Sequence, residues 1–446
     1  MKKVLALLAV AALTCVGGMA FAADVTTDGS IDIRSRAFDN LDASKTLRDN
    51  NRDTQERIRL GINAKAGEEV KARIQIENDL DTWGRVETYQ GNSSVNSPTV
   101  ELSNGLVSAK SYTVDNAHLM LREAWVEFKV PGLPVTIKGG HQLLQLGNGW
   151  FFRAMKYGSD AWVATTTVGD LSFALVDVKA MEWAKDGDTD TYTFIAKMKL
   201  NDKTNVGLDL TQGRVSDGAN YGKLGAGTIL NNIGLNYTGV VGPVNLKAEL
   251  DLQSGSLNSV PTGTAAKTAR QAKGQQVVIQ GNMPVAGLTV NFTVAQGSGQ
   301  SATAAANEQK QFVNLLDGDP HYTFLYEYKM NTAASSVVTG SKKSTGFANT
   351  RAINLGASTK VGSSLDLALD VWLLTAVEKV SINGGTASDK LGTEVDAKIN
   401  WKLYDNLTWN WTLGYFKTGD AYAYAAATKN SNDAATGVQG VLTMKF

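Results

Sequence analysis

Residues 365–373 read Leu-Asp-Leu-Ala-Leu-Asp-Val-Trp-Leu, and they carry the pattern that decides the fold. Apolar residues occupy every second position, and aspartate stands at two of the positions between them. Successive side chains of a β-strand point to opposite faces, so a period of two predicts a strand with one apolar and one polar face. An amphipathic helix would instead repeat its apolar positions every three or four residues.

The same alternation runs from Gly29 to the last residue, and helical periodicity is nearly absent. Eight short turns and nine long polar segments alternate between the runs, which predicts about eighteen strands, within a range of sixteen to twenty. The short turns are expected at 66–69, 131–134, 168–170, 201–204, 239–243, 284–287, 362–364 and 404–406. The long segments are expected at 39–53, 82–116, 147–159, 182–190, 214–227, 255–274, 298–349, 376–391 and 418–434. No change in composition marks a boundary, so residues 23–446 are expected to form one domain.

The polar face of these strands is too charged to be the core of a soluble sandwich. A membrane barrel can turn its apolar face to lipid and its polar face to a water-filled lumen, with no strand edge left unpaired. The sequence therefore predicts an all-β transmembrane antiparallel barrel, with short periplasmic turns and long extracellular loops.

The N-terminal segment has the order of a secretory signal peptide. Lys2 and Lys3 precede an apolar stretch, and Ala20-Phe21-Ala22 resembles a cleavage site, so residues 1–22 are expected to be removed. Cys15 is the only cysteine, and it lies in this segment. Since Lys+Arg and Asp+Glu both number 43, bulk charge gives no reason to expect a nucleic-acid partner.

The chain ends in an amphipathic strand, Val438 to Phe446, whose terminal Phe446 looks like the assembly signal of bacterial outer-membrane barrels. Together with the segment from Lys138 to Gln142 and the run Gly147-Asn148-Gly149, this ending resembles the porin-like channels of Gram-negative bacteria. The resemblance is nearest to a deltaproteobacterial type typified by OmpJ and more distant to alginate-export barrels. It implies a place in the cell outer membrane, contact with outer-membrane lipid and lipopolysaccharide, and insertion by the barrel-assembly machinery. A homotrimer is compatible with it.

Charged residues on the polar face are candidates for the lining of a pore. Basic side chains gather on the first strands, where they would form a cationic wall, and acidic ones gather elsewhere. A count of these charges predicts a weak anion preference; the alternative is that the charges pair with one another and only keep the lumen wet. The basic candidates are Arg34, Arg36, Arg57, Arg59, Lys71, Arg73 and Arg122, and the acidic ones are Asp209, Glu249, Asp251, Asp366, Asp370, Glu394 and Asp396.

Two long segments are candidates for a loop that narrows the lumen. Segment 147–159 contains Trp150, Phe151, Phe152 and Arg153, which could alternatively form a lipid-facing aromatic rim. Segment 298–349 contains His321, Tyr322 and Tyr326, and it is expected either to plug the lumen or to form two further strands.

Other kinds of site have weaker support in the sequence. Asp186, Asp188 and Asp190 have a spacing compatible with Ca²⁺, but a solvated acidic turn explains them better. No catalytic motif or cofactor fingerprint occurs, so neither enzymatic activity nor a cofactor is expected. The favoured function is a porin for ions and small hydrophilic solutes. The alternative is a structural or adhesin-like barrel that supports extracellular or electron-transfer partners.

Overall fold

The computed structural model describes residues 23–44, 50–78, 81–83, 119–182, 187–216, 224–258, 269–301, 305, 307–316, 321–330, 346–425 and 433–446. The predicted signal peptide and Asp186 lie outside this part of the chain. No helix among the described residues is long and apolar enough to cross a membrane.

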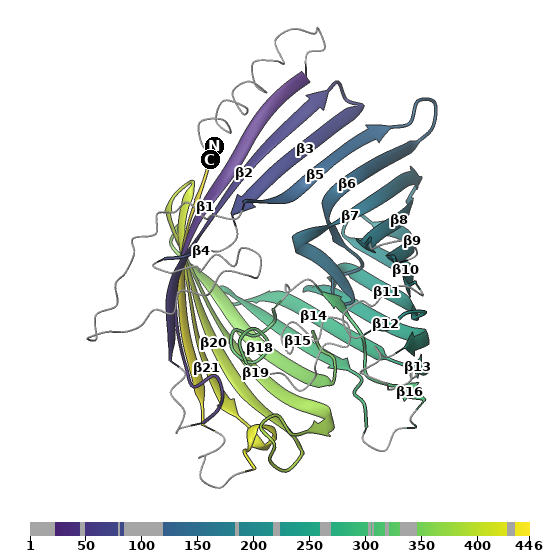
Figure 1. Cartoon of the computed structure of the whole chain (residues 1–446). Helices are drawn as coiled ribbons and strands as arrows, with labels where there is room; N and C mark the ends of the chain where they lie inside the picture. The colour runs from purple at the N-terminus through teal and green to yellow at the C-terminus, as the bar shows by residue number, and fades with distance from the viewer. Residues whose placement is uncertain are drawn as a thin grey trace, which may run out of the picture.

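Eighteen long strands form the wall of one closed antiparallel barrel, as the alternation predicts (Figure 1). Each wall strand pairs with the next along the chain, and the last pairs with the first. The wall strands are β1 (Ala23–Asp39), β2 (Asn51–Ala66), β3 (Val70–Asn78), β5 (Leu119–Lys129), β6 (Val135–Gln145), β7 (Phe152–Val168), β8 (Leu171–Met181), β9 (Thr189–Asn201), β10 (Thr204–Val215), β11 (Ile229–Val241), β12 (Val244–Asn258), β14 (Gln275–Val285), β15 (Leu288–Gly297), β18 (Thr350–Val361), β19 (Leu365–Val380), β20 (Ser388–Tyr404), β21 (Leu407–Thr418) and β22 (Ala435–Lys445). Four short strands and one turn of 3-10 helix lie outside this ring: β4 (Asp81–Thr82), β13 (Ala269–Ala272), β16 (Glu308–Gln309), β17 (Leu315–Leu316) and η2 (Asp420–Tyr422).

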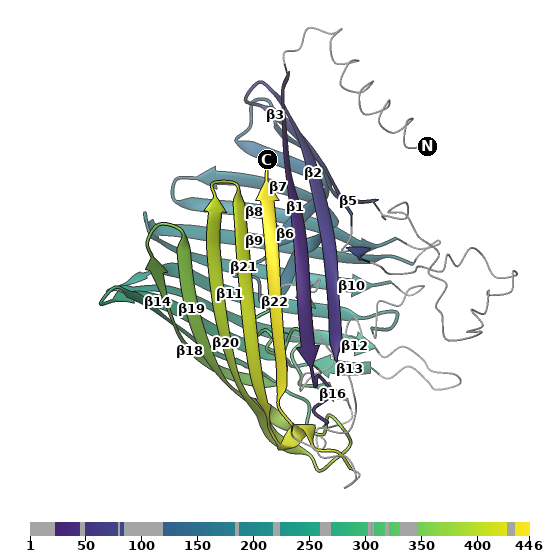
Figure 2. The same cartoon turned by 90° about the vertical axis from the view of Figure 1, so that its left-hand side faces the viewer.

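The ring closes between β1 and β22, which lie side by side in Figure 2. The pairing runs from Ser30 opposite Lys445 to Asp39 opposite Thr436. Beyond it, the backbone N–H of Gly29 donates to the carbonyl of Phe446 at 2.8 Å, and the N–H of Phe446 donates to the carbonyl of Gly29 at 3.1 Å. The Phe446 ring lies over Gly29, where an added Cβ would be 2.5 Å from it. The last residue of the chain therefore belongs to the closing seam.

The predicted short turns all join wall strands at one rim of the barrel, here called the turn rim. The long connections lie at the opposite, loop rim. Several strands extend further toward the loop rim than the sequence indicates: β7 begins at Phe152, inside predicted segment 147–159, and β19 runs to Val380, inside predicted segment 376–391. The start of β7 departs from the regular pairing with β6 and pairs with β17, so the period of two does not mark it.

The two faces of the wall separate apolar from polar side chains. Large apolar side chains are exposed on the outside, for example Trp162 at 61% and Leu355 at 63%. A soluble protein does not expose such a continuous belt, whereas lipid covers it in a membrane barrel. The loop-rim half of the interior is filled by inward-folded connections that bury two apolar clusters of their own, one around Tyr326 and one around Phe151.

Candidate functional site

Two connections fold into the barrel and narrow its interior. The first inward segment, residues 146–151, joins β6 to β7. The second inward segment, residues 321–330, belongs to the connection between β15 and β18. Trp150, Phe151 and Phe152 are buried inside the barrel, so they do not form the lipid-facing rim that the sequence left open. The connection 298–349 adds no wall strands, since β16 and β17 are two residues long each and pair with β13 and β7.

A single carboxylate on β12 holds the first inward segment. The backbone N–H groups of Trp150 and Phe151 donate to Glu249 Oε1 at 3.1 and 3.2 Å. The N–H of Asn148 donates to Glu249 Oε2, and the Asn148 side chain donates to the carbonyl of Ala248 at 2.8 Å. Three backbone N–H groups thus donate to the two oxygens of one side chain, so Glu249 anchors the segment to β12.

A glycine beside the anchor leaves room for two aspartates. Gly234 of β11 lies opposite Asp251 of β12 and opposite Asp209 of β10. An added Cβ there would be 3.1 Å from Asp251 and 3.5 Å from Asp209. Asn232 donates to Asp251 at 2.9 Å and Asn236 donates to Asp209 at 2.9 Å, so amides solvate these two carboxylates. Glu249 and the two aspartates form a pocket that receives the backbone of the first inward segment rather than its side chains.

The second inward segment is held in the same way on β20. The N–H groups of Leu325 and Tyr326 donate to the two oxygens of Glu394 at 2.5 and 2.8 Å. The N–H of Phe324 donates to Asp396 at 3.2 Å. Gly414 of β21 lies opposite Asp396, and an added Cβ there would be 2.7 Å from the Phe324 ring. The same arrangement therefore occurs twice: a Glu-x-Asp motif on the inner face, with a glycine opposite the aspartate, holds an inward segment.

The two inward segments meet through aromatic rings. Trp150 lies 4.7 Å from Phe347 and 6.4 Å from Tyr322, and Tyr322 stacks on Phe347 at 4.2 Å between ring centroids. Burial raises the pKa of the Tyr322 phenol well above its usual value, and nearby Tyr326 adds to the effect. The junction is therefore an uncharged aromatic contact, and the two segments form one constriction.

Two polar cavities lie beside this constriction. His321 and Tyr322 of the second inward segment and Lys398 of β20 line both of them. One cavity of about 550 Å³ reaches Lys203 and Lys247 near the turn rim. The other, of about 380 Å³, lies against β1, β2 and β20 to β22 and is lined by Arg34, Arg57 and Tyr328 among others. His321 accepts or donates a 2.5 Å hydrogen bond with Glu327 and lies 4.4 Å from the Tyr328 ring, which fixes its orientation.

Most of the basic residues predicted to line a cationic wall are paired with acids on nearby strands. Arg57 contacts Asp32 at 2.8 Å, Arg36 contacts Asp53 at 2.7 Å, and Lys71 contacts Glu127 at 3.2 Å. Arg73 contacts Asp28 at 2.6 Å and Glu123 at 3.0 Å, and Glu77 pairs with both Arg59 and Arg122. These pairs correspond to the alternative in which the charges neutralise one another. The interleaved partners Asp28, Asp32, Asp53 and Glu123 were not identified from the sequence.

Arg34 is different, because its hydrogen-bond partners among the described residues are neutral. Its two terminal nitrogens donate to Gln55 Oε1 at 2.6 Å and to the Tyr328 hydroxyl at 3.3 Å. Its Nε is buried without a hydrogen-bond partner in the described part of the chain. Arg34 lines the smaller polar cavity, and no carboxylate hydrogen-bonds to it among the described residues.

The predicted acidic residues face the interior, but most of them lie under the inward segments. Asp209, Glu249, Asp251, Glu394 and Asp396 are all at most 4% exposed, so they hold segments rather than face open water. Asp370 accepts from Asn291 at 2.7 Å and from Lys398 at 3.2 Å, and half-exposed Asp366 lies near Lys360. No group of metal-ligating side chains exists in the described ranges. Asp188 and Asp190 instead contact Lys179 at 3.3 and 2.8 Å.

Solved structures share this architecture. The chain is similar to a BenF-like porin from Pseudomonas fluorescens Pf-5, with a TM-score of 0.55 and 11% sequence identity over 95% of this chain and 98% of that one. It is also similar to Pseudomonas aeruginosa OccK9 (OpdG), with a TM-score of 0.54 and 12% identity over 95% and 98%, and to P. aeruginosa OccK2 (OpdF) in complex with glucuronate, with 0.52 and 9% over 95% and 96%. The fold is that of outer-membrane porins. No family model and no curated protein sequence matches the chain.

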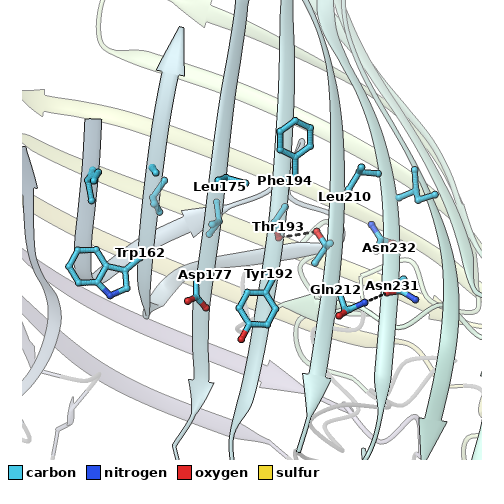
Figure 3. Close-up of a pocket in the computed structure, with 16 residues that line it drawn as sticks. Trp162, Leu175, Asp177, Tyr192, Thr193, Phe194, Leu210, Gln212, Asn231 and Asn232 are labelled. Carbon is cyan, nitrogen blue, oxygen red and sulfur yellow. Dashed lines mark hydrogen bonds between the residues drawn. The ribbon is translucent and has the colours of Figure 1, made fainter. Parts of the chain in front are cut away.

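A hollow of about 820 Å³ lies on the outer wall of this porin fold, across β6 to β11 (Figure 3). Trp162, Leu175, Phe194 and Leu210 are exposed there on neighbouring strands. Its polar border includes the Gln212 side chain, which donates to Asn231 at 2.9 Å. The hollow belongs to the lipid-facing belt of the porin fold, so its size carries no information about the solute.

Proposed function

We propose that the protein is an outer-membrane channel through which ions and small hydrophilic solutes diffuse passively, with a weak preference for anions. The observation that carries the proposal is a closed eighteen-strand barrel whose interior is narrowed, with polar cavities at the narrowing. Barrels of this size have an interior wide enough for an aqueous channel. The inward segments reduce that width to a scale at which solutes contact side chains.

Arg34 and its surroundings support the anion preference. Five other arginines of β1 to β5, namely Arg36, Arg57, Arg59, Arg73 and Arg122, pair with carboxylates, so they add little net field to the lumen. Arg34 instead binds neutral partners. Lys398, on the opposite side of the same cavity, adds a second cation, partly neutralised by Asp370. The structure of OccK2 in complex with glucuronate offers a parallel, since glucuronate is a carboxylate.

The same proposal includes the features that the sequence predicts around the barrel. They are removal of residues 1–22, insertion by the barrel-assembly machinery, contact with outer-membrane lipid and lipopolysaccharide, homotrimeric assembly, and the resemblance to the OmpJ type. Fractionation of cells that express the full chain tests the location, and cross-linking in the membrane tests the trimer.

Planar-bilayer recording of the purified protein tests the channel itself. We expect stepwise current increases and, in a KCl gradient, a reversal potential on the side of anion selectivity. Correctly folded protein that inserts and gives no steps would overturn the channel proposal. Steps with cation selectivity would overturn only the anion preference.

A further inference from the structure

A third hollow, of about 320 Å³, lies apart from the two polar cavities. We call it the side chamber. The start of β7 and the short strand β17 bound it on one side, and wall strands β8 to β11 bound it on the other. Its apolar lining includes Phe152, Val178, Val215, Leu230, Leu315 and Leu316.

The side chamber exists because β7 leaves its neighbour. The β7–β8 ladder stops at Asp160 opposite Lys179. On the other edge of β7, pairing with β6 jumps from Ser159 to Ala154, so residues 155–158 stand outside the ladder. Gly158 has a φ of +78° at this point, and an added Cβ would be 2.7 Å from the His141 ring. Residues 152 and 153 then pair in parallel with β17 inside the barrel, and space remains between them and the wall.

The apolar lining is unusual for the inner face of a porin fold. Val178 and Leu230 are each 3% exposed, and they point inward, where the walls of the polar cavities carry charged and amide side chains. Hydrophilic solutes gain nothing from such a surface. A cavity that is mostly apolar with a few polar groups is the usual form of a small-molecule site.

Two residues that line the side chamber each have a buried polar atom with no hydrogen-bond partner in the described part of the chain. The hydroxyl of Thr189, a residue only 5% exposed, is one of them, and Nε of Arg153 is the other. A buried polar group without a partner costs about 1–3 kcal/mol, so native proteins rarely keep one without a reason. Since an arginine Nε can only donate, its missing partner must be an acceptor.

The other charges near the chamber are already compensated or exposed. Lys179 contacts Asp188 and Asp190, and His141 contacts Asp160 at 2.8 Å. Arg214 is exposed to solvent. No described carboxylate forms an ion pair with Arg153, so the chamber presents a cation to its contents.

We propose that the side chamber binds a small monocarboxylate with an apolar body. The carboxylate accepts from Arg153 and Thr189, and the body packs against Phe152, Val178 and Leu230. At about 30 Å³ per small group, the volume admits roughly ten non-hydrogen atoms. The site lies outside the two polar cavities, and its occupancy does not depend on whether the chain conducts.

Equilibrium dialysis with labelled hexanoate tests the proposal on the full chain in lipid nanodiscs, with empty nanodiscs as the blank. Acetate supplies the head group without the body, and hexylamine supplies the body with the opposite charge. We expect hexanoate to bind at least about tenfold more tightly than either, because burial of four extra methylene groups and a charge-assisted hydrogen bond both contribute. Equal binding of hexanoate and acetate, or stronger binding of hexylamine, would overturn the proposal.

Three variants locate the site. Arg153→Gln removes the cation and should weaken hexanoate binding about tenfold, and Thr189→Val removes the hydroxyl at nearly constant shape and should weaken it severalfold. Thr193→Val is the matched control, because Thr193 lies on the same strand, is buried to 4% and pairs with Thr211 outside the chamber. Heat-modifiable migration on gels shows which variants fold. If Thr189→Val folds and binds as tightly as the control, the assignment is wrong, even where Arg153→Gln does not fold.

Discussion

Glu249 receives the backbone of Trp150 from across the barrel: the N–H of Trp150 donates to its Oε1 at 3.1 Å, although 99 residues separate the two. The same oxygen also accepts from the N–H of Phe151. One carboxylate on the wall therefore sets where the first inward segment lies, and with it the width of the lumen. The same holds for Glu394 and the second inward segment.

Replacing Glu249 by Gln should release the first inward segment. Glutamine offers one acceptor oxygen, and its amide N–H₂ would face backbone donors that now bind a carboxylate. A buried backbone N–H left without an acceptor costs about 1–3 kcal/mol, which would raise the released population roughly tenfold. In single-channel recordings we expect a larger conductance state to become frequent.

Glu127→Gln is the matched control for that experiment. Glu127 also lies on the inner wall, but it pairs with Lys71 and contacts neither inward segment. A conductance histogram for folded Glu249→Gln that matches both the wild type and this control would refute the anchoring role.

Replacing Glu394 by Gln should release the second inward segment, and its effect should depend on Glu249. The segments touch through Trp150, Tyr322 and Phe347, so freeing one removes part of the support of the other. Contacting elements give non-additive double-mutant effects, whereas independent ones add. We expect the free-energy change of opening in the double variant to be smaller than the sum of the changes in the two single variants. Simple additivity would show that the aromatic junction does not couple the segments.

Replacing Arg34 by Gln should shift ion selectivity toward cations. Its partners Gln55 and Tyr328 are neutral, so its removal takes away a positive charge without stranding a described carboxylate partner. Reversal potentials in a KCl gradient measure the shift. Arg34→Lys should keep the selectivity of the wild type, and Arg351→Gln, on an outward-facing position of β18, should leave it unchanged. An unaltered reversal potential in Arg34→Gln would show that Arg34 does not contribute to ion selectivity.

Replacing Gly29 by Val should impair barrel closure. An added Cβ would lie 2.5 Å from the Phe446 ring and 2.8 Å from the carbonyl of Arg59, and the second contact is to backbone that cannot move aside easily. We expect a marked loss of the heat-modifiable folded form. Gly213→Ala is the control, because its Cβ would make only an ordinary 3.7 Å contact with Thr191. Equal folding yields for the two variants would contradict this role of the seam.

The sequence was sufficient to predict the barrel and its strand number. A period of two fixes which face a residue lies on, and the alternation of short and long connections fixes the topology. The sequence did not predict that the first inward segment covers Glu249, because this contact depends on how a segment about 100 residues away folds back. The repeated Glu-x-Asp motif, with a glycine opposite the aspartate, was the available signal. Recognising it requires the register between strands, and the pairing of Arg57 with Asp32 required the same knowledge.

The seam between Gly29 and Phe446 also sets an order of events. Until β22 is in place, the edge of β1 that does not pair with β2 has no partner, and a row of unpaired backbone groups faces its surroundings. A chain that stops even one strand early is an open sheet, which cannot lie in hydrocarbon at any acceptable free energy. The pairing of β22 with β1 thus decides whether the sheet has a free edge, and the two hydrogen bonds between Gly29 and Phe446 extend that pairing by one residue.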